Sequence, residues 1–174
     1  MQNRIARPRQ IATRILQHTA LGAVVVIAAG LSPAFAEDGV AFPSGYRDWH
    51  HVKSMVIEEG HPLYAAFGGI HHLYANDLAM TGYRSERFPD GSVIVFDLLE
   101  AQRSDNAVVE GQRKVIGVMH KDSTRFADTG GWGFEGFAEG DPDRPVVGQT
   151  AADACFACHL PQREQDYTFS RLRD

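Results

Sequence analysis

The chain has 174 residues, with 17 Lys and Arg against 22 Asp and Glu, and a formal net charge of −5. Proteins that bind nucleic acid present basic surfaces, so this balance excludes nucleic acid as the expected partner. The length suits one domain with one hydrophobic core.

The first 36 residues have the order of parts found in a secretory signal peptide. Four arginines and no acid precede an apolar run at residues 20–31, and Ala34-Phe35-Ala36 is a small-x-small cleavage site. This run is shorter than the ~20 residues that a membrane-spanning helix needs, which disfavours the alternative of a retained membrane anchor. We therefore expect a signal peptide at residues 1–36, a mature domain at residues 37–174 that begins with Glu37, a periplasmic location and no membrane span.

The mature domain keeps 13 basic and 22 acidic residues, which gives a net charge of −9. An acidic surface favours a basic redox partner through electrostatic steering. It is also what a merely soluble periplasmic protein presents, so both interpretations stay open.

Residues 46–59 open the mature domain with apolar residues at helical intervals. Trp49, Val52 and Met55 lie three residues apart, and Gly60 follows as a stop signal. This pattern predicts a first helix.

A β-prone run over residues 67–76 comes next. If the extended segment includes Phe67, then Phe67 and His71 share one face, because side chains alternate across a strand. The polar residues that end the run can cap a short helix over residues 77–84.

The clearest strand covers residues 92–99, after the tight turn Pro89-Asp90-Gly91. Alternation gives it one face with Ile94, Phe96 and Leu98 and another with Val93, Val95 and Asp97. A second strand is expected over residues 112–120, with Val115, Gly117 and Met119 on one face, and the pair suggests an antiparallel sheet.

Aromatic residues alternate with glycines in Trp132-Gly133-Phe134-Glu135-Gly136-Phe137. This pattern suits close packing against a flat ring, and it equally suits an aromatic-rich strand of an ordinary core. A Pro and Asp loop follows, and a helix is expected from Ala151 onward.

That helix carries Cys155-Phe156-Ala157-Cys158-His159, the motif with the most specific chemistry in the chain. Two thiols at this spacing each add to a haem vinyl group, and the histidine after the second becomes the axial iron ligand. A disulfide or redox pair and a zinc site are the alternatives. They are less favoured, because the chain has only these two cysteines and no second ligand pair.

These fragments, in this order, resemble the cytochrome P-460 family, whose other well-known branch is cytochrome c′-β. The fragments are Tyr46-Arg47-Asp48-Trp49, Phe88-Pro89-Asp90-Gly91 with the strand after it, Lys121-Asp122-Ser123-x-Arg125-Phe126-Ala127 with Trp132, the CxxCH motif, and Asp166-Tyr167-Thr168-Phe169. The resemblance implies an α+β fold, a mainly antiparallel β-sheet with a few helices and one covalently attached haem c near the C-terminus. It also implies that a homodimer is an option.

Three polar positions of the hydroxylamine-oxidising branch are absent here. The lysine that bonds covalently to its haem corresponds to Phe96, an arginine corresponds to His71, and a distal carboxylate corresponds to Gly117. Phe96 together with Phe67 resembles instead the phenylalanine pair that caps the distal haem face in the c′-β branch, which binds small gases.

Three functional hypotheses follow from this resemblance. In the first, Cys155 and Cys158 hold the haem, His159 holds the iron, and Phe67 and Phe96 form a dry distal pocket for nitric oxide or carbon monoxide. This protein would carry, sense or scavenge the gas, or transfer electrons. In the second, it is an oxidoreductase acting on hydroxylamine or nitric oxide.

The third hypothesis is a six-coordinate electron-transfer cytochrome with a redox partner protein. The role of His71 distinguishes the three hypotheses. His71 could be a catalytic base, a hydrogen-bond donor to the bound ligand, an iron ligand or a structural residue. Asp97 is a weaker candidate base, because strand alternation points it away from Phe96.

Overall fold

The computed structural model of the chain describes residues 39–173, so the expected signal peptide lies outside the described residues. Within this range the strands are β1 (His50–Ile57), β2 (Gly69–Ala75), β3 (Val93–Ser104), β4 (Ala107–Lys121) and β5 (Trp132–Ala138). The α-helices are α1 (Tyr64–Phe67), α2 (Asp77–Ser85) and α3 (Ala157–His159). No helix in the described part of the chain is long and apolar enough to cross a membrane.

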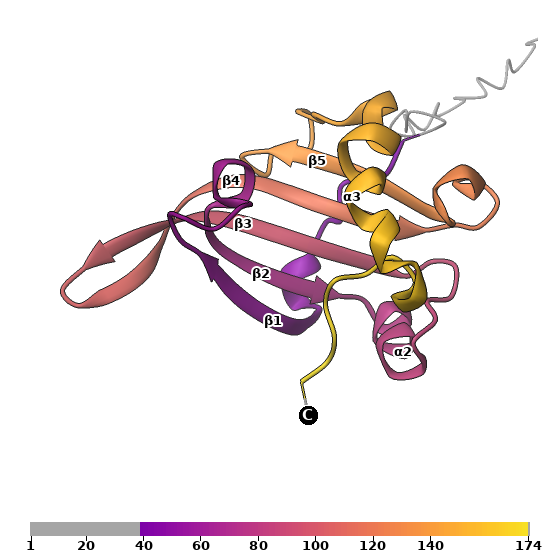
Figure 1. Cartoon of the computed structure of the whole chain (residues 1–174), viewed down its shortest axis with the longest axis horizontal. Coiled ribbons are helices and arrows are strands. Elements are labelled where there is room, and N and C mark those ends of the chain that lie inside the picture. The colour runs from indigo at the N-terminus through magenta and orange to yellow at the C-terminus, as the bar shows by residue number, and fades with distance from the viewer. Residues whose placement is uncertain (1–38, 174) are drawn as a thin grey trace, which may run out of the picture. The chain divides into compact units, whose positions relative to one another are not determined.

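The strands form one sheet in the order β1-β2-β3-β4-β5, and each neighbouring pair is antiparallel (Figure 1). The turn between β3 and β4 consists of Asp105 and Asn106, whose φ angles of 51° and 63° are those of a two-residue hairpin turn. Strand neighbours in sequence are thus neighbours in space, and the expected α+β fold with a mainly antiparallel sheet is confirmed.

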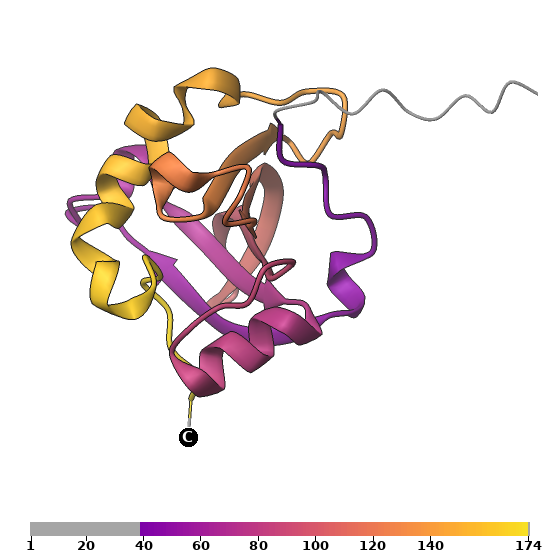
Figure 2. The same ribbon diagram turned by 90° about the vertical axis from the view of Figure 1, so that its right-hand side faces the viewer.

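The sheet has two buried faces. Its front face, which carries Ile94, Phe96 and Leu98, is covered by the C-terminal helical segment, and its back face, which carries Val95 and Asp97, is covered by the segment before β1 (Figure 2). The front-face core is the larger and contains Phe88, Trp132 and Phe134, with Cys155, Phe156 and Tyr167 packed against it.

The predicted helix over residues 46–59 is wrong. Only Tyr46–Asp48 is helical, as a short 3-10 turn, and the rest is strand β1. The register between β1 and β2 shifts between His51 and Lys53, so buried Val52 and Ile57 do not alternate strictly. Such an irregularity adds a residue to one strand and hides the period of two, which is why the sequence resembled a helix.

The expected helix after β2 is confirmed as α2. The side chain of Asn76 accepts a hydrogen bond from the backbone N–H of Ala79 at 2.9 Å and also one from Val93 N–H at 3.1 Å. One amide oxygen therefore caps the helix and joins it to the start of β3.

The aromatic and glycine run forms β5, an edge strand of the core. A side chain at Gly133 would collide with Phe126 and lie 2.6 Å from Val40, and Gly136 faces Val146 and Val147. These glycines make room for protein side chains, which favours the ordinary-core interpretation of this run.

Candidate functional site

The two cysteines of the CxxCH motif lie on one continuous helical segment, which runs through a π-helical stretch (Ala152–Phe156) into α3. Both thiols are free; Cys155 is half-buried against the front-face core and Cys158 is exposed. The charge of Cys158 acts on the Cys155 thiol, so the two thiols lie near each other. This placement suits two thioether bonds to one flat ring.

Burial raises the pKa of the Cys155 thiol, and the charges of Glu135 and Cys158 act in the same direction. A catalytic Cys-x-x-Cys pair needs a lowered thiol pKa, since the thiolate is the nucleophile. The environment of Cys155 therefore disfavours the redox-pair alternative.

The helical segment is held at its start by Glu135, a buried carboxylate on β5. Glu135 Oε1 accepts hydrogen bonds from the backbone N–H groups of Gly136 and Val147, each at 2.8 Å, and Oε2 accepts one from Gly148 at 3.0 Å. The bonds from Val147 and Gly148 satisfy backbone N–H groups that would otherwise be unpaired at the beginning of the segment.

His159 ends α3 with its ring orientation fixed. Nδ1 lies 2.7 Å from the carbonyl oxygen of Tyr167, and because a carbonyl only accepts, Nδ1 carries the proton. The ring packs between Phe134 and Phe169, with centroid distances of 5.0 and 4.9 Å. Burial lowers the pKa of His159 and the bond to Tyr167 opposes this shift, so a neutral imidazole offers Nε2 to a metal.

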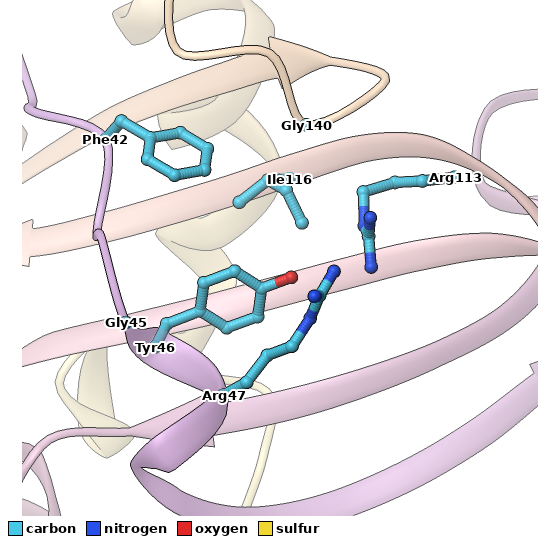
Figure 3. A pocket seen from close by; sticks show the side chains of 7 residues that line it. All are labelled: Phe42, Gly45, Tyr46, Arg47, Arg113, Ile116 and Gly140. Carbon is cyan, nitrogen blue, oxygen red and sulfur yellow. The ribbon is translucent and has the colours of Figure 1, made fainter.

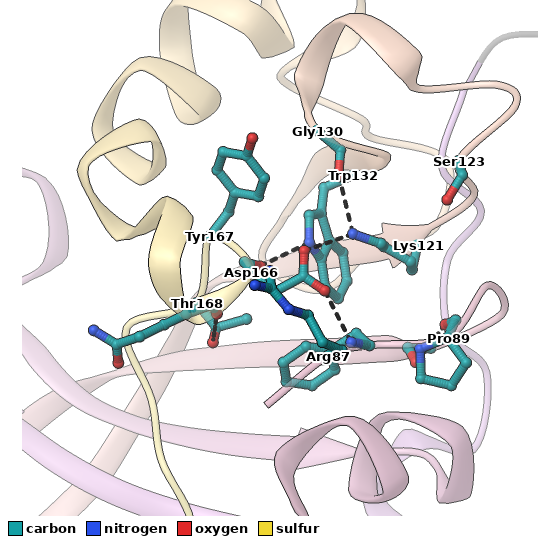
Figure 4. A network of polar contacts seen from close by, with 12 residues as sticks. Arg87, Pro89, Lys121, Ser123, Gly130, Trp132, Asp166, Tyr167 and Thr168 are labelled. Atoms are coloured by element: carbon teal, nitrogen blue, oxygen red, sulfur yellow. Dashed lines mark hydrogen bonds and ion pairs between the residues drawn. The ribbon is translucent and has the colours of Figure 1, made fainter. Parts of the chain in front are cut away.

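The Tyr167 carbonyl is itself held by the network around Asp166 (Figure 4). The Asp166 carboxylate accepts from Lys121 Nζ at 2.7 Å and from Phe88 N–H at 2.8 Å, while its backbone carbonyl accepts from the Trp132 indole at 2.9 Å. Asp166 and Tyr167 both have left-handed backbones, with φ of 49° and 63°. Such conformations cost roughly 1–2 kcal/mol per residue, and the network offsets this cost.

The expected distal residues come together on the front face. The ring of Phe96 meets the ring of Phe67 at 5.7 Å, edge to face, and the ring of His71 at 4.6 Å. Leu73, the cross-strand partner of Phe96, packs against the same core as Cys155. The distal residues and the CxxCH segment therefore belong to one face of the sheet.

Phe67 reaches this position differently from the sequence-based expectation. It ends helix α1 and is not in a strand, so the alternation that was expected to place it beside His71 does not apply. The segment is tied down by Lys114 Nζ, which donates to the carbonyl oxygen of Gly68 at 2.8 Å. At 41% exposure, Phe67 lies at the outer edge of the cluster.

His71 is only 4% exposed, and its Nδ1 has no hydrogen-bond partner in the described part of the chain. Burial lowers its pKa to about 4, and the charges of His72 and Lys53 add to the effect. The ring is therefore neutral at physiological pH. A buried polar atom without a partner is rare in proteins and often marks a ligand site.

The two other positions singled out from the sequence lie as strand alternation predicts. Gly117 is directly opposite Phe96 on the front face, and a Cβ there would lie 3.4 Å from the Phe96 Cβ, an ordinary contact. Asp97 is on the back face, where it accepts from Tyr46 and Arg113. It is therefore not available to a ligand on the front face.

These residues fit a c-type haem. Two free thiols lie on one helical segment, His159 presents an unprotonated Nε2, and the unpartnered Nδ1 of His71 belongs to a ring that contacts Phe96 on the same face of the sheet. Sequence reasoning missed the Tyr167 carbonyl and the Lys121–Asp166 ion pair, since a backbone acceptor and a contact across 45 positions carry no local signal.

Comparison with known proteins agrees with this geometry. The model of the family described as Cytochrome P460 matches residues 43–170, which includes every strand and the CxxCH motif. No curated protein matches the chain.

Proposed function

Because the chain belongs to the cytochrome P460 family and is thus a c-type haem protein, we propose that it binds a small diatomic gas, nitric oxide or carbon monoxide, in an apolar distal pocket. The observation that carries the proposal is the contact between the rings of Phe67 and Phe96 on the face that also bears the CxxCH segment. Binding would serve to carry, sense or scavenge the gas, with electron transfer as a further role.

In this proposal Cys155 and Cys158 would hold one haem through thioether bonds, and His159 Nε2 would bind its iron. The bound haem supplies an iron atom at which a diatomic molecule coordinates. The Tyr167 carbonyl accepts the Nδ1 proton, which makes the imidazole a stronger donor and fixes the plane of its ring.

In this proposal the distal residues exclude water from the pocket and contact the bound gas. Phe67 and Phe96 present hydrocarbon edges that exclude water and offer no charge, which suits gases that need no charged partner. His71 is neutral and has one N–H, so it can donate a hydrogen bond to a bound ligand. Phe96 has no nucleophile with which to bond to the haem.

We further propose that the mature protein is one periplasmic domain, residues 37–174, released by cleavage after Ala36. Support comes from the order of basic, apolar and small residues in the first 36 positions. Attachment of a c-type haem to exported thiols agrees with this location.

A hydroxylamine or nitric oxide oxidoreductase is the second candidate, and the unpartnered Nδ1 of His71 is the observation in its favour. Oxidation of hydroxylamine requires a base that removes protons, and the best base titrates near the working pH. A His71 pKa of about 4 makes it a weak base, Gly117 has no carboxylate, and Asp97 faces the other side of the sheet. A missing base costs roughly 100- to 10,000-fold in rate.

The experiment is steady-state hydroxylamine oxidation with an artificial electron acceptor, run on the haem-loaded wild type, His71→Ala and Phe96→Lys. His120→Ala is the matched control, because His120 is a half-buried histidine on the back face whose pKa burial also lowers. We expect negligible turnover and reversible nitric oxide binding by the wild type. Robust turnover that only His71→Ala abolishes would establish the oxidoreductase instead.

A six-coordinate electron-transfer cytochrome is the third candidate and would need His71 as the second iron ligand. Its spectrum would be low-spin in the ferrous state and would change in His71→Ala. The ring of Phe96 lies 4.6 Å from that of His71 and would hinder His71 from binding an iron, which disfavours this candidate.

A further inference from the structure

The back face of the sheet holds a cavity that the proposed haem function does not use. It has a volume of about 360 Å³ and lies between the segment before β1, strand β4 and the turn after β5 (Figure 3). Its lining combines two aromatic or aliphatic side chains, Phe42 and Ile116, with Tyr46 and two arginines, Arg47 and Arg113. Pockets that bind small molecules typically have volumes of roughly 300–1,000 Å³, and this cavity lies at the lower end of that range.

Two of the lining residues, Tyr46 and Arg113, bind a buried carboxylate, whose charge Arg113 balances. Asp97, which is 2% exposed, accepts from Arg113 Nε at 2.7 Å, from Arg113 Nη2 at 3.2 Å and from the Tyr46 hydroxyl at 2.6 Å. This arrangement occupies one edge of the Arg113 guanidinium. The remaining nitrogen, Nη1, has no hydrogen-bond partner among residues 39–173.

Arg47 contributes a second guanidinium that is not balanced. It makes no ion pair with any residue in the described range, whereas Arg144 and Arg103 pair with Glu139 and Glu58. Its Cζ atom lies 5.5 Å from the centroid of the Tyr46 ring, and its guanidinium points along the cavity wall toward Arg113 (Figure 3).

Two cations converging beside one neutralised carboxylate leave a net positive charge in a protein that is otherwise acidic. Both arginines affect the pKa of the Tyr46 hydroxyl. Burial and Asp97 raise its pKa to about 12, while Arg113 and Arg47 oppose that rise. Like charges that face one another favour an anion between them.

We propose that this cavity binds a small organic carboxylate. Guanidinium forks match carboxylates in bidentate geometry, so Arg47 would take both oxygens and Arg113 Nη1 would add a third contact. Phe42 and Ile116 would cover the apolar part of the ligand. The site is on the opposite face from the CxxCH segment and does not depend on the haem.

The affinity of such a site is modest. Arg47 is exposed, and ion pairs at a surface contribute little because water and salt screen them. A ligand with few non-hydrogen atoms is also limited in binding free energy, so a dissociation constant of roughly 1 mM is expected.

The probe is benzoate, titrated calorimetrically into the haem-loaded protein at constant ionic strength. Benzamide, which has the same shape without the charge, and sulfate, which has charge without an apolar body, are the control ligands. We expect saturable binding of benzoate and at least roughly tenfold weaker binding of both controls.

Three variants locate the binding site. Arg47→Gln is expected to weaken benzoate binding at least roughly tenfold, and Arg144→Gln, which removes an arginine already paired with Glu139, is expected to leave it unchanged. Phe42→Ala is expected to weaken benzoate but not acetate. The proposal would be overturned if benzoate did not bind, if sulfate bound equally well, or if Arg47→Gln left the affinity for benzoate unchanged.

Discussion

The carbonyl oxygen of Tyr167 lies 2.7 Å from Nδ1 of His159, eight positions earlier in the chain. This one contact defines the tautomer of the expected iron ligand, and the surrounding network decides where that carbonyl lies. The network joins a strand, a loop and the C-terminal segment through Lys121 and Asp166. The first prediction concerns this ion pair.

Lys121→Met should lower the free energy of unfolding by about 3–5 kcal/mol, because it leaves the buried Asp166 carboxylate without its counter-charge. Lys114→Met is the matched control. Lys114 is exposed and loses only its bond to the Gly68 carbonyl, so about 1 kcal/mol is expected. Urea unfolding of both variants measures the difference. Equal losses would show that the buried ion pair is not the anchor of this network.

The second prediction concerns acid stability. In the folded protein the pKa of His71 is about 4, below the ordinary value of 6.5, so between these pH values His71 is protonated in the unfolded chain and neutral in the folded one. This difference does not affect the free energy of unfolding above pH 6.5, and it lowers that free energy as the pH drops from about 6.5 toward 4. His71→Leu should remove roughly 2–3 kcal/mol of this loss.

Denaturant unfolding of wild type and His71→Leu at pH 4.5 and pH 7 tests this prediction. His120→Leu, in which another lowered histidine pKa is removed, controls for a general effect of the pH. A pH dependence that is the same in wild type and His71→Leu would contradict the assigned protonation of His71.

Two glycines in the sheet should differ in how much stability is lost on substitution by alanine. A Cβ at Gly117 meets Phe96 at ordinary contact distance, so Gly117→Ala should change stability by less than about 0.5 kcal/mol. Gly133→Ala forces a methyl group against Phe126 and Val40 and should cost about 1–3 kcal/mol. Thermal unfolding compares the two, and a large loss in Gly117→Ala would mean that the distal face is more tightly packed than described.

The distal cover should control ligand entry. Phe67 is the more exposed ring of the aromatic pair, so Phe67→Ala should speed association of carbon monoxide by roughly tenfold, equivalent to about 1.4 kcal/mol of barrier. Phe42→Ala, which removes a ring from the back face, is the control and should not alter the rate. Flash photolysis of the carbon monoxide complex gives both rates. An unchanged rate in Phe67→Ala would remove Phe67 from the ligand path.

The sequence predicted the centre of the fold and failed at its edges. Strict alternation over residues 92–99 identified β3, and the register confirms the separate faces of Phe96 and Asp97. The sequence of strand β1 predicts a helix, because its bulge hides the alternation and an edge strand exposes apolar residues such as Met55. The boundaries of β4 were short by five residues at its start, because the hairpin beyond the core carries no buried face.

The candidate site shows the same division. The CxxCH motif consists of neighbouring residues and can therefore be recognised from the sequence, and the predicted family of the chain is confirmed. The contact of Phe67 with Phe96 exists, although Phe67 was placed in the wrong element. The Tyr167 carbonyl was beyond prediction, because left-handed backbones at Asp166 and Tyr167 depend on the network that holds them.

The most direct test of the proposed function is the absorption spectrum of the purified ferrous protein before and after nitric oxide is added. The structure places the aromatic ring of Phe96 4.6 Å from the ring of His71, on the face of the sheet that also bears the CxxCH segment. We therefore predict a five-coordinate ferrous haem whose spectrum changes fully and reversibly with nitric oxide. A low-spin six-coordinate ferrous spectrum that nitric oxide does not alter would contradict the account.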